Sequence, residues 1–216
     1  VGESGSGKSI TALSVLRLVD AASTSGSIRF DGEELTAKSE REMRGIRGSA
    51  ISMIFQEPMT ALNPLYTVGN QIGEVLELHE AMRPAAARAR AIELLRHTGI
   101  PEPERRIDAY PHEFSGGQRQ RIGIARALAV NPKLVVCDEA VSALDVSIQA
   151  QVINLLEDLR SQLNLTYIFI AHDLSVVEHI SHRVAVMYLG RIVEIAPAKA
   201  LYTDPRHPYT EALLSA

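Results

Sequence analysis

Two hydrophobic periodicities alternate along the chain, one typical of buried strands and one typical of amphipathic helices. Short apolar runs predict strands at residues 50–56, 134–137 and 167–171. Apolar residues at helical spacing predict helices at residues 8–19, 115–129 and 146–163, and a short helix that ends near Ile180. Because strands and helices take turns, the pattern predicts an α/β fold built on a parallel sheet.

Three segments depart from this alternation. Hairpins are predicted at residues 26–35, with a turn at Asp31-Gly32, and at residues 183–195, with a turn near Leu189-Gly190. Residues 58–110 are mostly helical and lie between two links that contain proline. Within this stretch Pro84 favours the start of a helix and Gly99 its end. We interpret the stretch as a helical subdomain inserted into the α/β core.

The first residues, "VGESGSGKS", fit a phosphate-binding loop of the form Gly-x-x-x-x-Gly-Lys-Ser. Glycines in such a loop let successive backbone N–H groups point at phosphate oxygens, and the following helix N-terminus adds a favourable dipole. Lys8 is expected to contact the β and γ phosphates, and the Ser9 hydroxyl is expected to bind Mg²⁺. The predicted phosphate-binding residues are Gly2, Glu3, Ser4, Gly5, Ser6, Gly7, Lys8 and Ser9.

Four other polar residues follow the predicted strands: Gln56, Asp138, Glu139 and His172. Because ligands of open parallel sheets bind at the carboxyl ends of the strands, we expect these side chains to meet the loop at one edge. Asp138 suits Mg²⁺, directly or through its water shell, and Glu139 can deprotonate the attacking water. Gln56 can orient that water or reach the metal, and His172 can hydrogen-bond the γ-phosphate. Each residue taken alone is more often an ordinary loop or surface residue.

Composition narrows the class of protein. The 216 residues are 46% hydrophobic and 22% charged, which is globular. The formal net charge of -4 gives no sign of a nucleic-acid partner, which would call for clustered Lys and Arg. Cys137 is the only cysteine, so we read it as a core residue and expect no iron–sulfur cluster in this chain. No apolar run approaches the ~18 residues that span a bilayer, and no signal-peptide pattern is present.

The stretch "FSGGQRQR" (residues 114–121) resembles the signature sequence of ABC ATPases, with Phe114 where leucine is usual. The order of phosphate loop, Gln56, signature, "LVVCDE", "SALD" and His172 is similar to that family over nearly the whole chain. The resemblance implies a P-loop NTPase (RecA-like) core that binds ATP and Mg²⁺. It also implies a head-to-tail dimer, in which the signature faces ATP on the other subunit and Asp145 lies at the interface. The signature residues concerned are Ser115, Gly116, Gly117 and Gln118.

A finer resemblance is to the ATP-binding subunits of dipeptide and oligopeptide importers, including the glutathione type. It rests on "IFQEPMTALNP", "DEAVSALDVSIQAQVINLL" and the ending "HPYTEALLSA". It implies transmembrane permease partners, a second ATP-binding subunit (identical or not), an indirect substrate-binding protein outside the membrane, and a peripheral location on the cytoplasmic face of the inner membrane. The implied segments are residues 1–57 (core, first part), 58–113 (helical subdomain), 114–190 (signature helix and core, second part) and 191–216 (C-terminal extension).

Two other functions remain open from the sequence. A soluble ABC ATPase acting on ribosomes or DNA is one, although the interval between loop and signature lacks a long coiled coil. A subunit that binds nucleotide without hydrolysis is the other, although every expected catalytic position is filled. Ala140-Val141 stands where many family members have Pro-Thr, and this removes no catalytic group.

The position of the phosphate loop is unusual, because only Val1 precedes it. The family architecture puts strands and an adenine-stacking aromatic residue before the loop. The resemblance therefore implies an N-terminally truncated sequence. We expect residues 1–216 alone to fold poorly and to bind ATP weakly.

Overall fold

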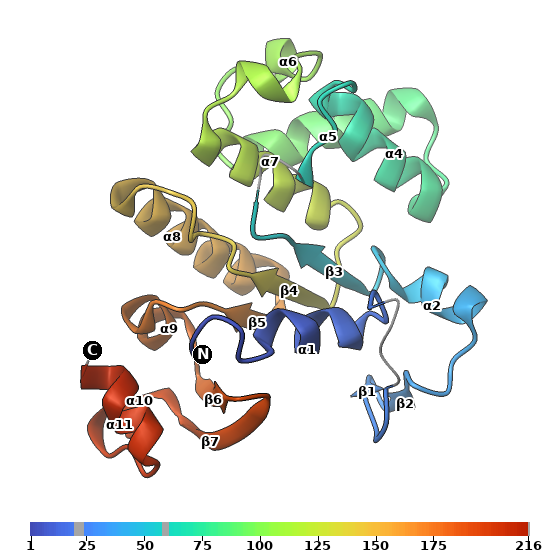
Figure 1. Cartoon of the computed structure of the whole chain (residues 1–216). Coiled ribbons are helices and arrows are strands. Elements are labelled where there is room, and N and C mark those ends of the chain that lie inside the picture. Colours follow the sequence, from blue (N-terminus) through green and yellow to red (C-terminus); the bar gives the residue numbers. More distant parts are fainter. Residues whose placement is uncertain (20–23, 58–60, 216) are drawn as a thin grey trace. The chain divides into compact units, whose positions relative to one another are not determined.

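The computed structural model describes residues 1–19, 24–57 and 61–215 of the chain (Figure 1). It divides into two compact units, which are described one at a time: unit 1 comprises residues 1–38 and 168–216, and unit 2 comprises residues 39–167. The link predicted around residue 58 lies outside the described residues. Throughout the described ranges, each helix is too short or too polar to cross a membrane.

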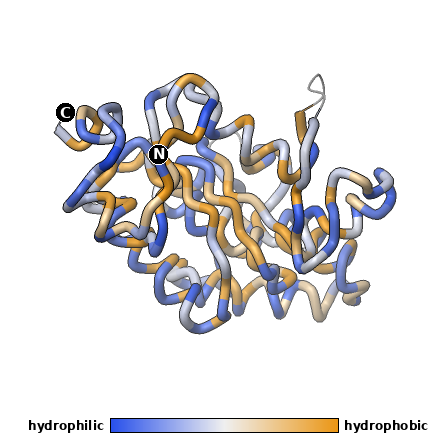
Figure 2. Tube along the Cα trace, turned by 90° about the horizontal axis from the view of Figure 1, so that it is seen from below, coloured by the Kyte–Doolittle hydropathy of each residue, from blue (hydrophilic) through white to orange (hydrophobic). Residues whose placement is uncertain are grey.

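The centre of unit 2 is a parallel pair of strands. β3 (Ile51–Ile54) pairs with β4 (Leu134–Asp138), with Ile51 opposite Leu134 and Ile54 opposite Cys137. All five residues of β4 are buried, and the sheet order is β3-β4-β5, with β5 at Thr166–Ile170. Figure 2 shows hydrophobic residues along such extended segments and mixed colouring along the helices. A run that is apolar on both faces is typical of a strand in a covered parallel sheet.

Cys137 is a core residue, as predicted. Its side chain is fully buried in β4, and desolvation raises the pKa of the thiol to about 12. The thiol therefore stays protonated and behaves as a small apolar side chain.

The helices of unit 2 form a second hydrophobic core, in which α4, α5 and α7 pack side by side (Figure 1). Ile72 of α4, Leu95 of α5 and Ile122 of α7 are fully buried there. Pro84 begins α5 and Gly99 follows it with φ 74°, as the sequence predicted. The helices are α2 (Glu40–Ile46), α4 (Val68–Glu80), α5 (Pro84–His97), α6 (Pro103–Arg106), the 3₁₀ turn η1 (Pro111–Glu113), α7 (Gly116–Ala127) and α8 (Val146–Leu163).

Unit 1 begins with the glycine-rich loop and α1 (Lys8–Val15). The predicted helix over residues 8–19 is four residues too long. The amide of Leu18 donates to the Leu13 carbonyl and the amide of Arg17 to the Ser14 carbonyl, with Arg17 at φ 52°. This is the Schellman ending, which usually carries glycine where Arg17 stands. The missing glycine is why the sequence pattern did not reveal the end of the helix.

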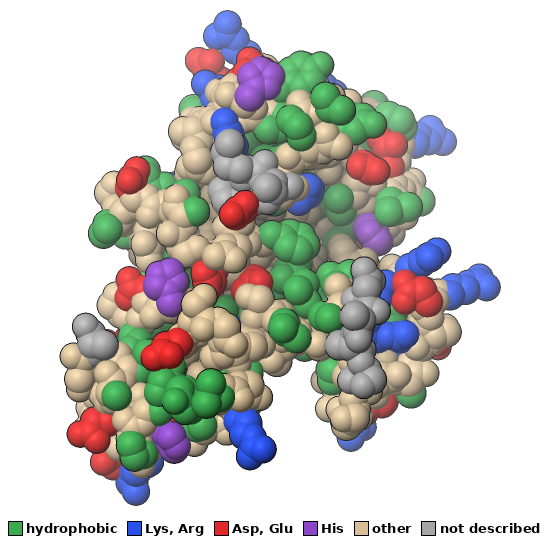
Figure 3. All heavy atoms as spheres, viewed as in Figure 1, with side chains coloured by type: hydrophobic (Ala, Val, Ile, Leu, Met, Phe, Trp, Pro, Cys, Tyr) green, Lys and Arg blue, Asp and Glu red, His purple; other side chains and the backbone are tan. Residues whose placement is uncertain are grey.

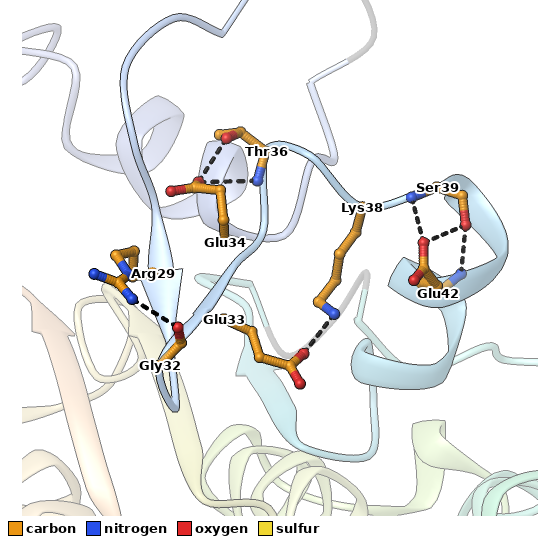
Figure 4. A network of polar contacts seen from close by, with 8 residues as sticks. All are labelled: Arg29, Gly32, Glu33, Glu34, Thr36, Lys38, Ser39 and Glu42. Carbon is orange, nitrogen blue, oxygen red and sulfur yellow. Dashed lines mark hydrogen bonds and ion pairs between the residues drawn. The ribbon is translucent and has the colours of Figure 1, made fainter.

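Both predicted hairpins are confirmed. The first pairs β1 (Arg29–Phe30) with β2 (Glu33–Glu34), and its turn places Asp31 and Gly32 at φ 52° and 84°. Figure 4 shows Arg29 donating to the Gly32 carbonyl at 2.8 Å and Glu34 accepting from the Thr36 amide at 3.2 Å. The same view shows the capping box in which Ser39 and Glu42 close the start of α2. The second hairpin pairs β6 (Arg183–Tyr188) with β7 (Arg191–Pro197).

The rest of unit 1 packs on the second hairpin. Val184 and Val186 of β6 are buried against Leu201, and partly buried Leu213 and Leu214 join them. The remaining helices of this unit are α9 (Leu174–Ile180), α10 (Ala198–Thr203) and α11 (Pro208–Ser215). The C-terminal segment is therefore part of a hydrophobic core and not an appended tail.

Candidate functional site

The glycine-rich loop turns through backbone conformations that favour glycine. Gly2, Gly5 and Gly7 have φ values of 141°, 79° and 97°, and Gly7 is the N-cap of α1. Residues with side chains seldom adopt such values, so the spacing of the three glycines sets the path of the chain. The loop delivers the backbone directly into the N-terminus of an eight-residue helix, where the first amides have no partners within the helix.

Lys8 lies against this loop. Its side chain is only 6% exposed, and its ammonium donates to the carbonyls of Gly2 at 2.8 Å and Glu3 at 2.9 Å. Two of the three ammonium donors are thereby directed back across the loop. Ser6 is also buried, and its hydroxyl has no hydrogen-bond partner in the described part of the chain. A buried donor without a partner in a loop of this kind is what an anionic ligand would satisfy.

The β6–β7 hairpin holds the loop at two points. The Met187 amide donates to the Val1 carbonyl at 2.8 Å, and the Gly190 amide donates to the Ser6 carbonyl at 3.1 Å. A Cβ atom on Gly2 would lie 2.1 Å from the Met187 carbonyl oxygen. Gly2 is therefore required for close approach to the hairpin as well as for its positive φ.

His172 lies in unit 1, in the short segment between β5 and α9, and is exposed. The next residue, Asp173, is the N-cap of α9 and accepts from the Ser175 amide at 2.9 Å. The hydrogen bond from the Ser175 hydroxyl is the largest of the effects that lower the pKa of Asp173. This cap fixes the backbone from which the imidazole projects.

In unit 2, the structure brings Gln56 and Glu139 into direct contact. The Gln56 amide nitrogen donates to the Glu139 carboxylate at 2.8 Å. Asp138 is the last residue of β4 and is 6% exposed, whereas the pattern had put it just past the strand. Glu139 takes a left-handed conformation with φ 45°, which is unusual for a residue with a side chain and recurs at functional sites.

The signature residues form the start of α7. Ser115 is the N-cap, its hydroxyl accepts from the Gln118 amide at 3.3 Å, and the Gln118 side chain accepts from the Ser115 amide at 3.1 Å. Gly117 lies so close to α8 that an added Cβ would meet the Ile148 side chain at 2.5 Å. Asp145 is the N-cap residue of α8. The start of α7 therefore lies beside the first turns of α8.

Phe114, which stands where leucine is usual, is accommodated in the core of the helices. Its ring is 3% exposed in the core of the helices, and the Arg106 guanidinium lies 5.0 Å from the ring centre. The larger ring thus gains a cation–π contact in addition to apolar burial.

The structure therefore contains two groups of candidate residues, one in each unit. The loop and His172 belong to unit 1, whereas Gln56, Asp138, Glu139 and the signature belong to unit 2. The gathering of all of them at a single edge stays a prediction.

Sequence reasoning did not assign three residues that support the loop: Met187, Gly190 and Tyr209. The Tyr209 hydroxyl accepts a hydrogen bond from the Glu3 amide at 2.9 Å. Met187 and Gly190 lie in an ordinary hairpin pattern and carry no signal of their own. Only the "HPYT" segment marked the region of Tyr209.

The chain is similar to known proteins in sequence and in fold. A family model described as "ABC transporter" matches residues 1–142. The "Peptidoglycan transport ATP-binding protein YejF" of Agrobacterium fabrum is 54% identical over 219 residues, which cover 100% of this chain and 40% of that protein. The "Oligopeptide transport ATP-binding protein OppD" of Bacillus subtilis is 52% identical over 218 residues, which cover 100% of this chain and 61% of OppD. The chain thus spans less than two thirds of either relative.

The solved structure of the ATP-binding cassette MJ0796, a dimer in a post-hydrolysis state bound to ADP and Pi, is similar with a TM-score of 0.79. It is 30% identical, and the match covers 91% of this chain and 83% of that one. The predicted α/β fold of the P-loop NTPase type, with its parallel sheet, is confirmed. The family match and the likeness of fold lead to one assignment: the chain belongs to the ABC transporter family.

Proposed function

We propose that this chain is the ATP-hydrolysing motor portion of an ABC importer for peptides, of the dipeptide, oligopeptide or glutathione type. The observation that carries the proposal is the loop of residues 2–9, with three left-handed glycines and Lys8 folded back across it. The named relatives are transport ATP-binding proteins, and OppD is one for oligopeptides. The names of these relatives do not favour the alternative of a soluble ATPase acting on ribosomes or DNA.

The residues of the loop are suited to bind a nucleoside triphosphate. The α1 N-terminus and the loop amides suit phosphate oxygens, and the buried Ser6 hydroxyl would gain a partner. Lys8 would exchange one of its carbonyl contacts for a phosphate. Ser9, Gln56 and Asp138 are the residues that would hold Mg²⁺, which neutralises charge on the phosphates when bound.

Glu139 is proposed as the general base. It would take a proton from the attacking water while Gln56 orients that water. The direct hydrogen bond between Gln56 and Glu139 supports this pairing of roles. His172 is proposed to hydrogen-bond the γ-phosphate, and its segment is fixed by the Asp173 cap.

A second ATP-binding subunit, identical or not, would complete each site. Ser115, Gly116, Gly117 and Gln118 would face ATP bound to that subunit, and Asp145 would lie at the interface between subunits. The helix N-terminus at Ser115 supports this, because such an end attracts anions. The similar cassette MJ0796 was solved as a dimer.

The permease partner is proposed to insert a cytoplasmic helix into a groove of unit 2. The groove is lined by Ala61, Leu62, Asn63, Pro64, Leu65, Tyr66, Asn70, Gln71, Glu74, Val75 and Arg126. The buried Gln71 amide donates to the carbonyls of Asn63 and Tyr66 at 2.9 and 3.0 Å, which holds the 63–66 loop in place. Leu65 on this loop is 80% exposed. Figure 3 shows hydrophobic side chains on the visible face of the helical part at the top of the view.

Several finer points belong to the same proposal. Closure of the ATP-bound dimer would drive alternating access of the permease by hinge motion. A substrate-binding protein outside the membrane would deliver the peptide, and the motor would lie at the cytoplasmic face of the inner membrane. The segments 1–57, 58–113, 114–190 and 191–216 remain our proposed division of this part of the motor.

The test compares Glu139→Gln with Lys8→Ala in the full-length subunit. Glu139→Gln is expected to retain ATP binding, stabilise the dimer and lose hydrolysis, because an amide cannot accept the proton. Lys8→Ala is expected to weaken ATP binding by at least tenfold, since a charge-assisted hydrogen bond is worth about 1.5–3 kcal/mol. Nucleotide titration, size-exclusion chromatography and phosphate release measure the three properties.

Glu157→Gln on α8 is the matched control for the carboxylate, and it should behave like the parent. Hydrolysis by Glu139→Gln at the parent rate would remove Glu139 from the role of base. Unchanged nucleotide affinity in Lys8→Ala would refute the phosphate-binding role of the loop.

A further inference from the structure

The C-terminal segment contacts the phosphate loop through the side chain of Tyr209. The Tyr209 hydroxyl accepts from the Glu3 amide at 2.9 Å, although 206 residues separate the two in the sequence. Glu3 is the first residue after Gly2, at the entry of the loop. This contact lies within unit 1, as do all the contacts that position it.

Tyr209 is held in this direction by a tilted contact with another aromatic ring. Its ring lies against Tyr188 with the ring centres 4.2 Å apart and the planes at 33°. Tyr188 ends β6, two residues before Gly190, whose amide donates to the Ser6 carbonyl. Tyr188 thus connects Tyr209 to the hairpin that already holds the other side of the loop.

The residues before Tyr209 fix its backbone. The Glu194 carboxylate accepts from the amides of Arg206 and His207, each at 3.0 Å. The His207 Nδ1 atom in turn accepts from the Tyr209 amide at 3.1 Å. Pro208 begins α11, and the fixed φ of proline suits a first helical position.

These contacts give each residue of the His-Pro-Tyr stretch a definite purpose. His207 caps the turn, Pro208 starts the helix and Tyr209 projects toward the loop. Tyr209, Leu213 and Leu214 all pack against the core of unit 1, but this packing uses the ring of Tyr209 and not its hydroxyl. The hydroxyl on the Glu3 amide is an additional feature that core packing does not explain.

We infer that Tyr209 is a positioning residue for the phosphate loop, so that the C-terminal extension sets the affinity of the site for nucleotide. The inference rests on the proposed ATP-binding function. A glycine-rich loop loses much conformational entropy when it closes on a ligand, and a tether at its entry reduces that loss. Tyr209 acts through the Glu3 amide and has no proposed contact with the nucleotide.

The predicted effect separates affinity from turnover. Loss of one neutral hydrogen bond should weaken ATP binding and raise KM for ATP by about 2- to 10-fold. The kcat at saturating ATP should stay at the parent value, because bound nucleotide then holds the loop in its closed form.

The experiment uses the full-length subunit assembled with its permease. Tyr209→Phe removes the hydroxyl and keeps the ring that contacts Tyr188. Tyr202→Phe is the matched control, because the Tyr202 hydroxyl also lies in the C-terminal extension but donates to the Leu174 carbonyl. Nucleotide titration, KM, kcat and the thermal midpoint are measured for both variants and the parent.

The expected result is a raised KM for ATP in Tyr209→Phe alone. A shift of the thermal midpoint with an unchanged KM would overturn the inference, because it would show a purely structural contact. Equal KM changes in Tyr209→Phe and Tyr202→Phe would overturn it too. Lys8→Ala in the same assay tests the underlying function: if it leaves ATP binding intact, the proposed site fails, whereas a normal Tyr209→Phe beside a defective Lys8→Ala refutes only this inference.

Discussion

Gly2 shows, at the scale of one residue, why a glycine in the loop is required for two reasons. Its φ of 141° favours glycine, and its Cα faces the Met187 carbonyl so closely that a Cβ would lie 2.1 Å from the oxygen. Gly5 shares the positive φ, but none of the described residues comes within 4 Å of an added Cβ. A comparison of alanine substitutions at the two positions therefore separates the cost of backbone strain from the cost of a steric clash.

We predict that Gly2→Ala destabilises the protein more than Gly5→Ala does. Gly5→Ala should cost about 1–2 kcal/mol from the left-handed conformation alone. Gly2→Ala should cost about 1–3 kcal/mol more, because the clashing atom belongs to the backbone and cannot rotate away. Urea unfolding of the two full-length variants measures the difference. Equal unfolding free energies would mean that the hairpin can move away from the loop.

The contact between Gln56 and Glu139 is a residue-scale feature that the sequence could suggest. Both follow neighbouring parallel strands, and the register that pairs Ile54 with Cys137 brings the two ends together. The left-handed φ of Glu139 could not be foreseen, because it depends on how the chain leaves β4 and not on the residue type.

At the scale of elements, α7 and α8 meet through a glycine. Gly117 faces Ile148, whereas a Cβ on Gly123, farther along α7, would meet no atom of the described residues within 4 Å. One helix therefore carries a glycine needed for packing and a glycine that packing does not need.

We predict opposite effects for the two alanine substitutions in α7. Gly123→Ala should stabilise the protein by about 0.5–1 kcal/mol, because alanine loses less entropy in a helix. Gly117→Ala should destabilise it by about 1–3 kcal/mol, because the branched Ile148 side chain cannot yield without pushing α8 away. Thermal unfolding of each variant gives the signs. A stabilising Gly117→Ala would show that α8 adjusts freely.

The elements with clear end signals were predictable, and those without were not. The helix predicted over Val146–Leu163 has those bounds, because Asp145 precedes it and Asn164 ends it in a left-handed conformation. The end of α1 was missed because Arg17 takes the position that glycine usually occupies. The hydrophobic pattern of the sequence does not show where a residue other than glycine adopts the left-handed conformation.

At the scale of the whole molecule, the groove next to α4 is the surface through which we propose that the motor binds a permease. Leu65 is 80% exposed on the loop that Gln71 holds, and Leu78 is 74% exposed on α4 but does not line the groove. The two leucines match in residue type and exposure and differ in place.

We predict that Leu65→Asp reduces co-purification with the permease by about tenfold or more, since an apolar anchor at an interface is worth about 2 kcal/mol. Leu78→Asp should leave co-purification at the parent level. Pull-down from detergent extracts measures both, and unfolding midpoints verify that the variants are folded. If both variants, or neither, lose the permease, the groove is not the docking site.

The supports of the phosphate loop show what long-range structure adds to a sequence motif. The motif itself could be read from nine residues, because glycine, lysine and serine at fixed spacing have few other uses. Its anchors Met187 and Tyr209 lie 186 and 206 residues from their partners Val1 and Glu3, and they carry no comparable spacing. Only the fold brings them to the loop.

The burial of Cys137 has a practical consequence for labelling experiments. It is the only cysteine of the 216 residues, and its thiol keeps its proton until about pH 12. A protonated thiol is a poor nucleophile toward alkylating reagents. Single cysteines placed on the surface of this chain can therefore take spin or fluorescent labels selectively over Cys137, and distances between labels on two subunits can follow the proposed closure of the dimer during turnover.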